Sequence, residues 1–195
     1  MACINKLSGD IQFSCDDKPK KGIANSKAVI INYEDVDFGA STVSGATISN
    51  LALKSGATGY QLSWYKELGS ATGEAVIDPE QIDGFGHSFM GRLSTTSANN
   101  AERARELKAG KFVVVYESKY QGATQGDAFK VLGFENGLEL AELTTSTVEN
   151  SGSILFTLST LDDEFESFPY QVLLDVDYTT TKADFDALFA VVAAA

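Results

Sequence analysis

Histidine, cysteine and proline are scarce in this chain of 195 residues, and the first two limit its chemistry. His87 is the sole histidine, so a Ser-His-Asp triad would have to use it, and the chain has no Gly-x-Ser-x-Gly sequence. One histidine and two cysteines also fall short of the four such ligands that structural zinc usually takes. We therefore expect no catalytic, cofactor-binding or metal-binding residues, and a protein that is not an enzyme.

Long apolar runs and an excess of positive charge are missing as well. No run approaches the roughly 18 apolar residues of a membrane helix, and residues 1–10 contain no continuous apolar stretch, so we expect neither a membrane partner nor a signal peptide. The net charge of −12 opposes any binding mode that neutralises nucleic-acid phosphates. It is compatible with a surface past which nucleic acid slides without sticking. Cys3 and Cys15 either pair across a hairpin or remain thiols, and the lack of a secretion signal favours thiols.

Acidic residues are the most abundant candidate metal ligands. They form three clusters, at 16–17, 34–37 and 162–166. Each offers oxygens for calcium, but none has the EF-hand spacing, and we interpret them as solvated turns between strands. A carboxylate pair for glycoside hydrolysis stays open, because the fold decides which carboxylates meet. Gly84-x-Gly86 lacks the full phosphate-binding pattern. We interpret His87 beside it as a polar residue in a glycine-rich bend.

Three aromatic residues, Tyr60, Trp64 and Tyr65, are candidates for stacking against sugars. Aromatic residues that alternate along strands are more often core residues or members of cross-strand pairs, and we favour that interpretation.

Alternation of apolar and polar residues predicts strands over most of the chain. Turn residues at 55–58 predict a hairpin between 47–54 and 59–66, and Asn136-Gly137 is a strong hairpin signal that makes the later strands a meander. Residues 39–46 and 67–82 are predicted to be flexible loops, with Pro79 opposing a central strand. The predicted strands comprise residues 9–15, 28–33, 47–54, 59–66, 85–93, 112–116, 128–134, 138–145, 153–159 and 168–176.

One internal helix is predicted immediately before the most apolar strand. Asn99 or Asn100 is placed to cap a helix from Ala101 to Ala109, and Gly110 follows as a left-handed cap. A second helix is predicted in a C-terminal arm, 181–195, where Thr181 and Asp184 have capping-box spacing. The arm presents one apolar face, made of Phe185, Leu188, Phe189 and Val192.

These elements predict a mainly β protein: an antiparallel β-sandwich or barrel with one flanking α-helix and a C-terminal helix. Because helices do not alternate with strands, a parallel α/β arrangement is not expected. We expect residues 1–195 to form a single domain.

The order of segments resembles virion proteins of tailed phages and prophages of Bacteroidetes. The resemblance rests on residues 29–37, 48–56, 59–60, 129–138 and 154–158. Within a virion the layout looks most like a tail-tube protein. That resemblance implies a β-sandwich or barrel with a helix beside it, a long hairpin and flexible arms, assembled into stacked six-fold rings whose strands join into a continuous inner barrel.

This resemblance implies a function and a set of partners. The chain would be a phage tail-tube subunit, made in the host cytoplasm and located in the virion, that associates with itself and with other tail proteins while DNA passes without sticking. An acidic lumen would repel that DNA. The inter-subunit contact candidates are two charged helix residues and the apolar face of the C-terminal arm: Arg103, Arg105, Phe185, Leu188 and Phe189.

Rival functions stay open at this point. Another virion role, such as capsid decoration, tail terminator or baseplate component, would share the strand pattern without a continuous lumen. A carbohydrate-binding or adhesion β-sandwich would need exposed aromatic residues. A hydrolase that uses buried carboxylates is the least favoured.

Overall fold

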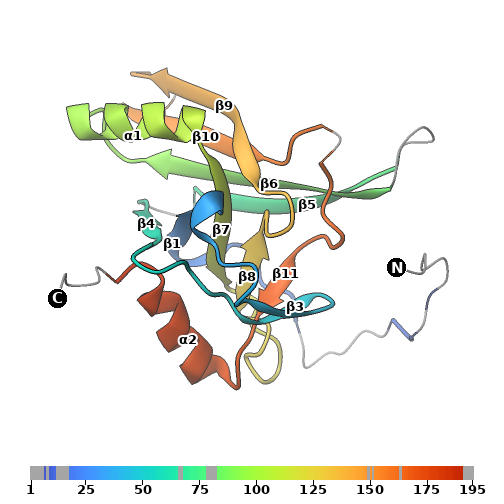
Figure 1. Ribbon diagram of the computed structural model, residues 1–195. Coiled ribbons are helices and arrows are strands. Elements are labelled where there is room, and N and C mark those ends of the chain that lie inside the picture. Colours follow the sequence, from blue (N-terminus) through green and yellow to red (C-terminus); the bar gives the residue numbers. More distant parts are fainter. Residues whose placement is uncertain are drawn as a thin grey trace.

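The computed structural model describes residues 7, 9–11, 18–65, 68–77, 83–148, 150, 152–162 and 164–190. The thiols of Cys3 and Cys15, most of the expected strand at 9–15, and residues 191–195 lie outside the described residues. Gly9–Ile11, which are described, form no strand. The elements, shown in Figure 1, are β1 (Ile23–Asn32), η1 (Tyr33–Asp35), β2 (Thr42–Ser44), β3 (Thr47–Asn50), β4 (Tyr60–Ser63), β5 (Ser70–Val76), β6 (Gly84–Leu93), α1 (Ala98–Ala109), β7 (Lys111–Ser118), β8 (Phe129–Leu132), β9 (Leu138–Ser146), β10 (Ser153–Ser159), β11 (Gln171–Leu173) and α2 (Tyr178–Ala187).

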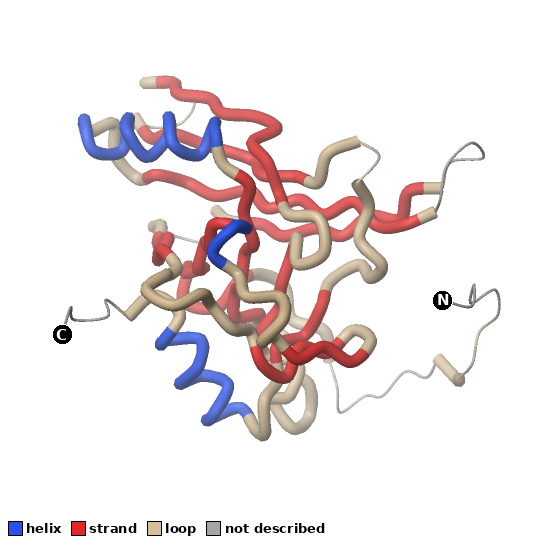
Figure 2. The backbone as a smooth tube through the Cα atoms, viewed as in Figure 1, coloured by secondary structure: helices blue, strands red, loops and turns tan. Residues whose placement is uncertain are grey.

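The fold is mainly β, with two α-helices beside the strands, which confirms the predicted fold class (Figure 2). The hydrogen-bonded strands follow one path, β2-β3-β11-β8-β7-β9-β10-β6-β5, and β1 joins β7 to β4. We call β4, β1, β7, β8, β11, β3 and β2 the lower layer, and β9, β10, β6 and β5 the upper layer, after their places in Figure 1. The pairing is antiparallel except between β11 and β3, which are parallel.

The centre of the lower layer is buried on both faces. Successive residues of β1 and β7 belong alternately to two apolar clusters: Val29 and Val113 to one, Ile30 and Val114 to the other. This explains why both strands read as continuous apolar runs in place of an alternating pattern. The first cluster lies between the lower layer and α2, and the second lies between the two layers and includes Leu107 of α1.

Residues 133–137 join the layers without a hairpin, so the hairpin predicted at Asn136-Gly137 is wrong, whereas the next pair of the predicted meander, β9 and β10, is antiparallel as expected. β8 and β9 both pair with the same edge of β7, with Leu132 opposite Val114 and Leu138 opposite Phe112. The chain therefore continues in one direction, and 133–137 form a bulge whose amides face inward. Gly133 and Gly137 adopt left-handed φ angles of 72° and 77°, which this excursion requires.

Two other predicted connections differ from the structure. Segments 47–54 and 59–66 do not pair with each other, because β3 pairs with β2 and β11 while β4 pairs with β1. Residues 67–82 are not a plain loop, because Ser70–Val76 form β5 and pair along their whole length with β6. Thr42–Ser44, within the predicted loop 39–46, form the short edge strand β2.

Both helices are present as predicted, but each begins earlier in the chain than expected. Ser97 caps α1 by accepting a hydrogen bond from the Asn100 amide at 3.2 Å, and Gly110 has a φ of −104°, not a left-handed angle. Asp177 caps α2 by accepting from the Thr180 amide at 2.7 Å, so the helix begins before the expected Thr181.

Candidate functional site

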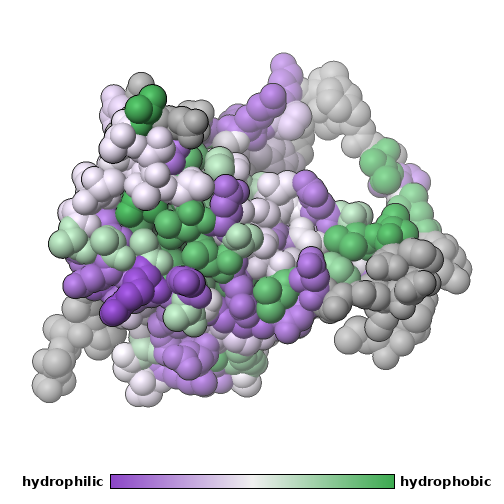
Figure 3. Space-filling view, turned by 90° about the horizontal axis from the view of Figure 1, so that it is seen from above, coloured by the Kyte–Doolittle hydropathy of each residue, from purple (hydrophilic) through white to green (hydrophobic). Residues whose placement is uncertain are grey.

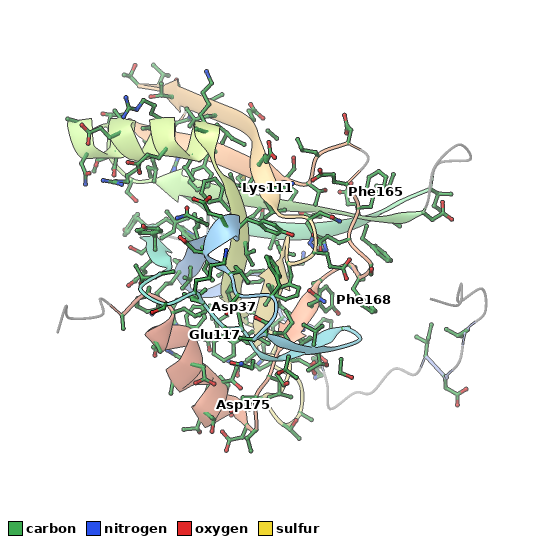
Figure 4. The ribbon with its side chains drawn as sticks, in the orientation of Figure 1. Asp37, Lys111, Glu117, Phe165, Phe168 and Asp175 are labelled. Atoms are coloured by element: carbon green, nitrogen blue, oxygen red, sulfur yellow. The ribbon has the colours of Figure 1, made fainter. Side chains whose placement is uncertain are left out.

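A buried polar cluster lies where β6, the 133–137 bulge and the segment after β10 meet. We call His87, Lys111, Glu135, Asn136 and Glu166 the polar junction. His87 and Glu166 are each 2% exposed. Glu166 forms a two-way backbone bridge with Phe85, which extends the edge of β6 beyond β10. Figure 4 places Lys111, Phe165 and Phe168 around this region.

His87 connects three elements through its ring. Nδ1 accepts a hydrogen bond from the Gly133 amide at 3.0 Å, and Nε2 lies 2.8 Å from the Phe168 carbonyl oxygen. Because a carbonyl only accepts, Nε2 carries the proton and the ring is neutral. Burial lowers the pKa of His87, while its bond to Phe168 and the nearby Glu135 oppose that shift.

Glu166 holds the 133–137 bulge by its backbone. Its two carboxylate oxygens accept from the Glu135 amide at 3.0 Å and the Asn136 amide at 2.9 Å. The Asn136 side chain donates back to the Phe165 carbonyl at 2.6 Å. Burial raises the pKa of Glu166, and the two amide hydrogen bonds counteract part of that rise.

Lys111 places a cation at the border of the junction. Its Nζ lies 2.6 Å from Glu164 and 3.9 Å from Glu139, and 5.7 Å from the centre of the Tyr33 ring. The Tyr33 hydroxyl donates to the Glu135 carbonyl. The junction therefore ties η1, β7, the bulge and the segment after β10 together.

The chemistry of the polar junction is structural. Both ring nitrogens of His87 are engaged by backbone groups, and both oxygens of Glu166 accept amide protons. Both side chains are 2% exposed, so neither is accessible to a substrate from solvent. The expectation that His87 sits in a glycine-rich bend is wrong: it lies in a paired part of β6, opposite Gly73, and is buried.

A second buried carboxylate, Glu117, lies at the far end of β7 from Lys111 (Figure 4). It is 4% exposed and accepts from the Tyr178 hydroxyl at 2.8 Å, the Gln121 amide group at 3.2 Å and the Asn25 amide group at 3.3 Å. These bonds attach the start of α2 to the sheet.

The acidic clusters found in the sequence separate into different roles. Asp37 accepts from the Gly39 and Ala40 amides, and Asp35 from the Asn32 side chain, as residues in a turn do. Glu166 departs from the expectation of a solvated turn because it is buried. Within the described residues, no three His, Cys, Asp or Glu side chains are grouped to hold a metal ion.

The upper layer ends at β5 on one side and at β9 on the other, where α1 contacts β9. β5 pairs only with β6, and β9 pairs with β10 on one side and with β7 only through Leu138 and Glu139 on the other. In the described part of the chain, no strand pairs with the other edge of β5 or with the remaining length of that β9 edge. Most residues of β5 are exposed, and so are Ala141, Glu142, Thr144 and Thr145 of β9.

The outward face of the upper layer is mostly polar. Phe156 and Leu158 of β10 point into the core, so Thr157, between them, points outward with its neighbours across the strands. By register this face carries Ser70, Thr72, Glu74, Ser88, Met90, Arg92, Glu142, Thr144, Leu155, Thr157 and Ser159. Seen from above, hydrophilic and pale side chains cover most of the described surface around a smaller hydrophobic area (Figure 3).

Arg103 and Arg105 lie on the exposed side of α1, where a neighbouring molecule can reach them. Arg103 forms an ion pair with Glu106, and both side chains are 52% exposed. Beneath the helix a groove of about 670 Å³ has apolar walls. Those walls include Leu62, Leu93, Leu107, Phe112 and Phe156.

The apolar face of α2 covers the chain's own sheet. Phe185 is fully buried and Leu188 is 7% exposed, and both belong to the cluster between α2 and the lower layer. Phe189 packs against that cluster, and the Lys27 ammonium lies 4.9 Å from its ring centre. In this conformation the three predicted contact residues pack against the core of their own subunit.

The aromatic candidates divide between core and surface. Trp64 is 6% exposed and packs edge-on against Phe89, as the favoured interpretation holds. Tyr60 and Tyr65 are 56% and 74% exposed.

Sequence reasoning missed the open edge of β5. Its signal was present in Ser70–Val76, which contain neither lysine nor proline, the residues that commonly protect an edge strand. Because most residues of this segment are small, it lacks the apolar alternation that predicts a strand. Glu166 was missed because its burial depends on contacts with residues about 30 positions away.

The fold and surface define a mainly β protein with a polar sheet face between two open edges. Comparison with protein-family models, with curated proteins and with solved structures finds no match. Within the described residues, neither helix is long and apolar enough to cross a membrane.

Proposed function

We propose that this chain is a structural virion protein, a subunit of the phage tail tube, that forms stacked rings around a DNA-conducting channel. The observation that carries the proposal is the upper layer, a four-stranded antiparallel sheet in which, among the described residues, no strand pairs with the outer edge of β5 or with β9 beyond Glu139. Open edges present unpaired backbone donors and acceptors, and closure into a ring removes them.

The β5 edge of the upper layer suits pairing better than the edges of the lower layer. β5 offers seven residues, whereas the edge strands β2 and β4 have three and four. β5 also pairs with β6 without a register shift, so no bulge disturbs its outer edge. A longer regular edge provides more inter-subunit hydrogen bonds.

The strand directions allow a closed ring. β9, β10, β6 and β5 are each antiparallel to the next, so β5 and β9 run in opposite directions. When β9 of a second copy lies beside β5 of the first, the pair is antiparallel and the alternation continues. Such a contact joins two different surfaces, and repeating it closes into a ring if the rotation between copies allows.

The composition of the outward face fits a channel wall. Glu74 and Glu142 are exposed there, and the chain carries a net charge of −12. Repulsion between these carboxylates and phosphates keeps DNA from adhering. The assignment to a phage tail, with assembly in the host cytoplasm and contacts to other tail proteins, rests on the resemblance of the strand segments to tailed-phage virion proteins.

Disulfide crosslinking tests the pairing of β5 with β9. Thr72 and Thr144 point to the same face of the sheet, so cysteines at both sites are within reach of each other in the register that places Thr72 opposite Thr144, which also places Glu74 opposite Glu142. The double variant Thr72→Cys/Thr144→Cys, made with Cys3→Ser and Cys15→Ser, is expected to give a ladder of oligomers on oxidation. A second double variant, Thr72→Cys/Glu142→Cys, covers a register shifted by two residues.

The single variants are the matched controls. Neither Thr72→Cys nor Thr144→Cys forms a ladder in a head-to-tail contact, because each cysteine faces a threonine. A covalent dimer of the Thr72→Cys variant alone would indicate β5-to-β5 pairing and contradict the ring. Monomers from both double variants at high protein concentration would also contradict it.

Negative-stain microscopy distinguishes the tube from other virion roles. Rings or tubes with a channel of DNA width are expected. Discrete particles without a channel would point to a decoration, terminator or baseplate protein. A stable monomer whose unfolding temperature rises with added sugar would point instead to carbohydrate binding through Tyr60 and Tyr65.

A further inference from the structure

His87 holds the middle of the β5–β6 hairpin to two segments that are distant in sequence. Its ring accepts from the Gly133 amide and donates to the Phe168 carbonyl, across separations of 46 and 81 residues. The strand itself is fastened there too, because the His87 carbonyl accepts from the Thr160 amide at 3.0 Å. Pro169 lies against Gly73 of β5, where an added Cβ would be 1.8 Å from its carbonyl oxygen.

One protonation state is compatible with this geometry. A doubly protonated ring carries a hydrogen on Nδ1, and that hydrogen would point at the Gly133 N–H, which is also a donor. Two donors cannot share a hydrogen bond, so the ring must separate from the bulge when it gains its second proton. Nε2 still donates to Phe168 in that state.

We propose that His87 is an acid-sensitive latch that fastens the β5–β6 hairpin to Gly133, at the start of the 133–137 bulge, and releases Gly133 when its ring is doubly protonated, while Glu166 and Tyr33 continue to hold the rest of the bulge. This inference concerns the single chain and does not depend on ring assembly. If the rings form, the latch controls the position of the hairpin that carries the β5 edge.

The other charged groups at this place set the direction of the response. Glu135 and Glu166 lie on the bulge and on the segment after β10, and Lys111 and Glu164 neutralise each other as an ion pair. Tyr33 donates to the bulge from η1. Glu135 favours the protonated ring, but burial outweighs it, so the pKa of His87 falls below its ordinary 6.5.

The difference in proton affinity of His87 between the latched and unlatched states sets the pH range of the response. The native state binds this proton less readily than the unlatched state, so the latch is complete above pH 6.5 and weakens as the pH falls toward the lowered value. Within this window the equilibrium for release rises by up to about tenfold per pH unit.

Hydrogen exchange of the Gly133 amide in the full chain measures the latch. After correction for the intrinsic exchange rate, its protection is expected to fall by up to about tenfold per pH unit below pH 6.5, while amides in the centre of β7 keep theirs. Nitrogen NMR of the wild-type ring at pH 7.5 is expected to show the proton on Nε2. The Nδ1 tautomer, or unchanged Gly133 protection down to pH 5, would overturn the proposal.

Two substitutions separate the two bonds. His87→Asn retains an acceptor near the Nδ1 position, and His87→Gln retains a donor near Nε2, and neither titrates in this range. His87→Asn is expected to keep Gly133 protected with no pH dependence, and His87→Gln to leave it weakly protected at every pH. Equal pH dependence in these variants and in the wild type would overturn the latch, and the wild-type measurements decide it even if a variant fails to fold.

Discussion

At the scale of single residues, His87 and Glu166 are both buried and respond to pH in opposite directions. The pKa of His87 is lowered, so its contribution to stability is lost as the pH falls below 6.5. The pKa of Glu166 is raised above its ordinary 4.5, so its contribution is complete below pH 4.5 and is lost as the pH rises through the native value. In both cases burial is the largest cause.

Glu166→Gln tests the role of the carboxylate. One glutamine position is an NH₂ group and cannot accept, so either the Glu135 or the Asn136 amide loses its buried partner. We expect the free energy of unfolding at pH 7.5 to fall by about 1–3 kcal/mol. The difference in free energy of unfolding between this variant and the wild type is expected to grow as the pH falls from above the native pKa of Glu166 toward 4.5. Chemical denaturation at a series of pH values measures it.

Glu164→Gln is the matched control for this substitution. Glu164 belongs to the same segment, but its side chain is 41% exposed and it pairs only with Lys111. An exposed pair of this kind contributes about 0–1 kcal/mol. A stability difference for Glu166→Gln that stays constant with pH, or grows toward alkaline pH, would contradict the assignment.

At the scale of elements, α2 belongs to the core of the subunit. Phe185 is fully buried and its ring lies 5.1 Å from that of Phe129, centre to centre. Removing residues 181–195 is therefore expected to impair folding of the subunit, because the removed residues include buried parts of the lower-layer core.

Phe185→Ala tests this revised role. The substitution leaves a cavity between α2 and the sheet, and we expect the free energy of unfolding to fall by about 3–5 kcal/mol. Ala183→Ser, at an exposed position of the same helix, is expected to change it by less than about 0.5 kcal/mol. Comparable stability of the two variants, with only assembly impaired in Phe185→Ala, would support an inter-subunit role instead.

Elements with strong local signals were predicted well. β7 follows from five consecutive apolar or aromatic residues, β6 from its alternation, and α1 from its helix formers, with the cap displaced to Ser97. β5 was missed because Ala, Gly and Glu, which make up more than half of the strand, are depleted in strands. It becomes a strand because β6 supplies its hydrogen-bonding partners over seven residues.

At the scale of the whole molecule, the upper layer supplies specific acids for the channel wall. Glu74 and Glu142 point outward from β5 and β9 and are exposed. Glu74→Lys/Glu142→Lys is expected to leave rings intact and to make them retain double-stranded DNA, because each ring then presents cations to the phosphates. Co-sedimentation of DNA with the assemblies, repeated at increasing salt concentration, measures this retention.

The charge-neutral variant Glu74→Gln/Glu142→Gln is the control. It removes the same carboxylates without adding cations, so it is expected to retain less DNA than the lysine variant, with a weaker dependence on salt. Equal retention by both variants would show that this face does not meet DNA. Loss of rings in the lysine variant alone would show that these two carboxylates contribute to the β5-to-β9 contact itself.

The sequence by itself determined the mainly β class, the strongly apolar strands, the two helices and the acidic balance. These properties depend on local periodicity and composition, which can be read from short stretches of the sequence. Only the tertiary structure decided which strands pair, how β8 continues into β9, that Glu166 and His87 are buried, and where the upper layer ends in edges. Each depends on contacts between segments far apart in the chain, and Asn136-Gly137 shows why: the same two residues suit a hairpin or a bulge, and the edge of β7 selects the bulge.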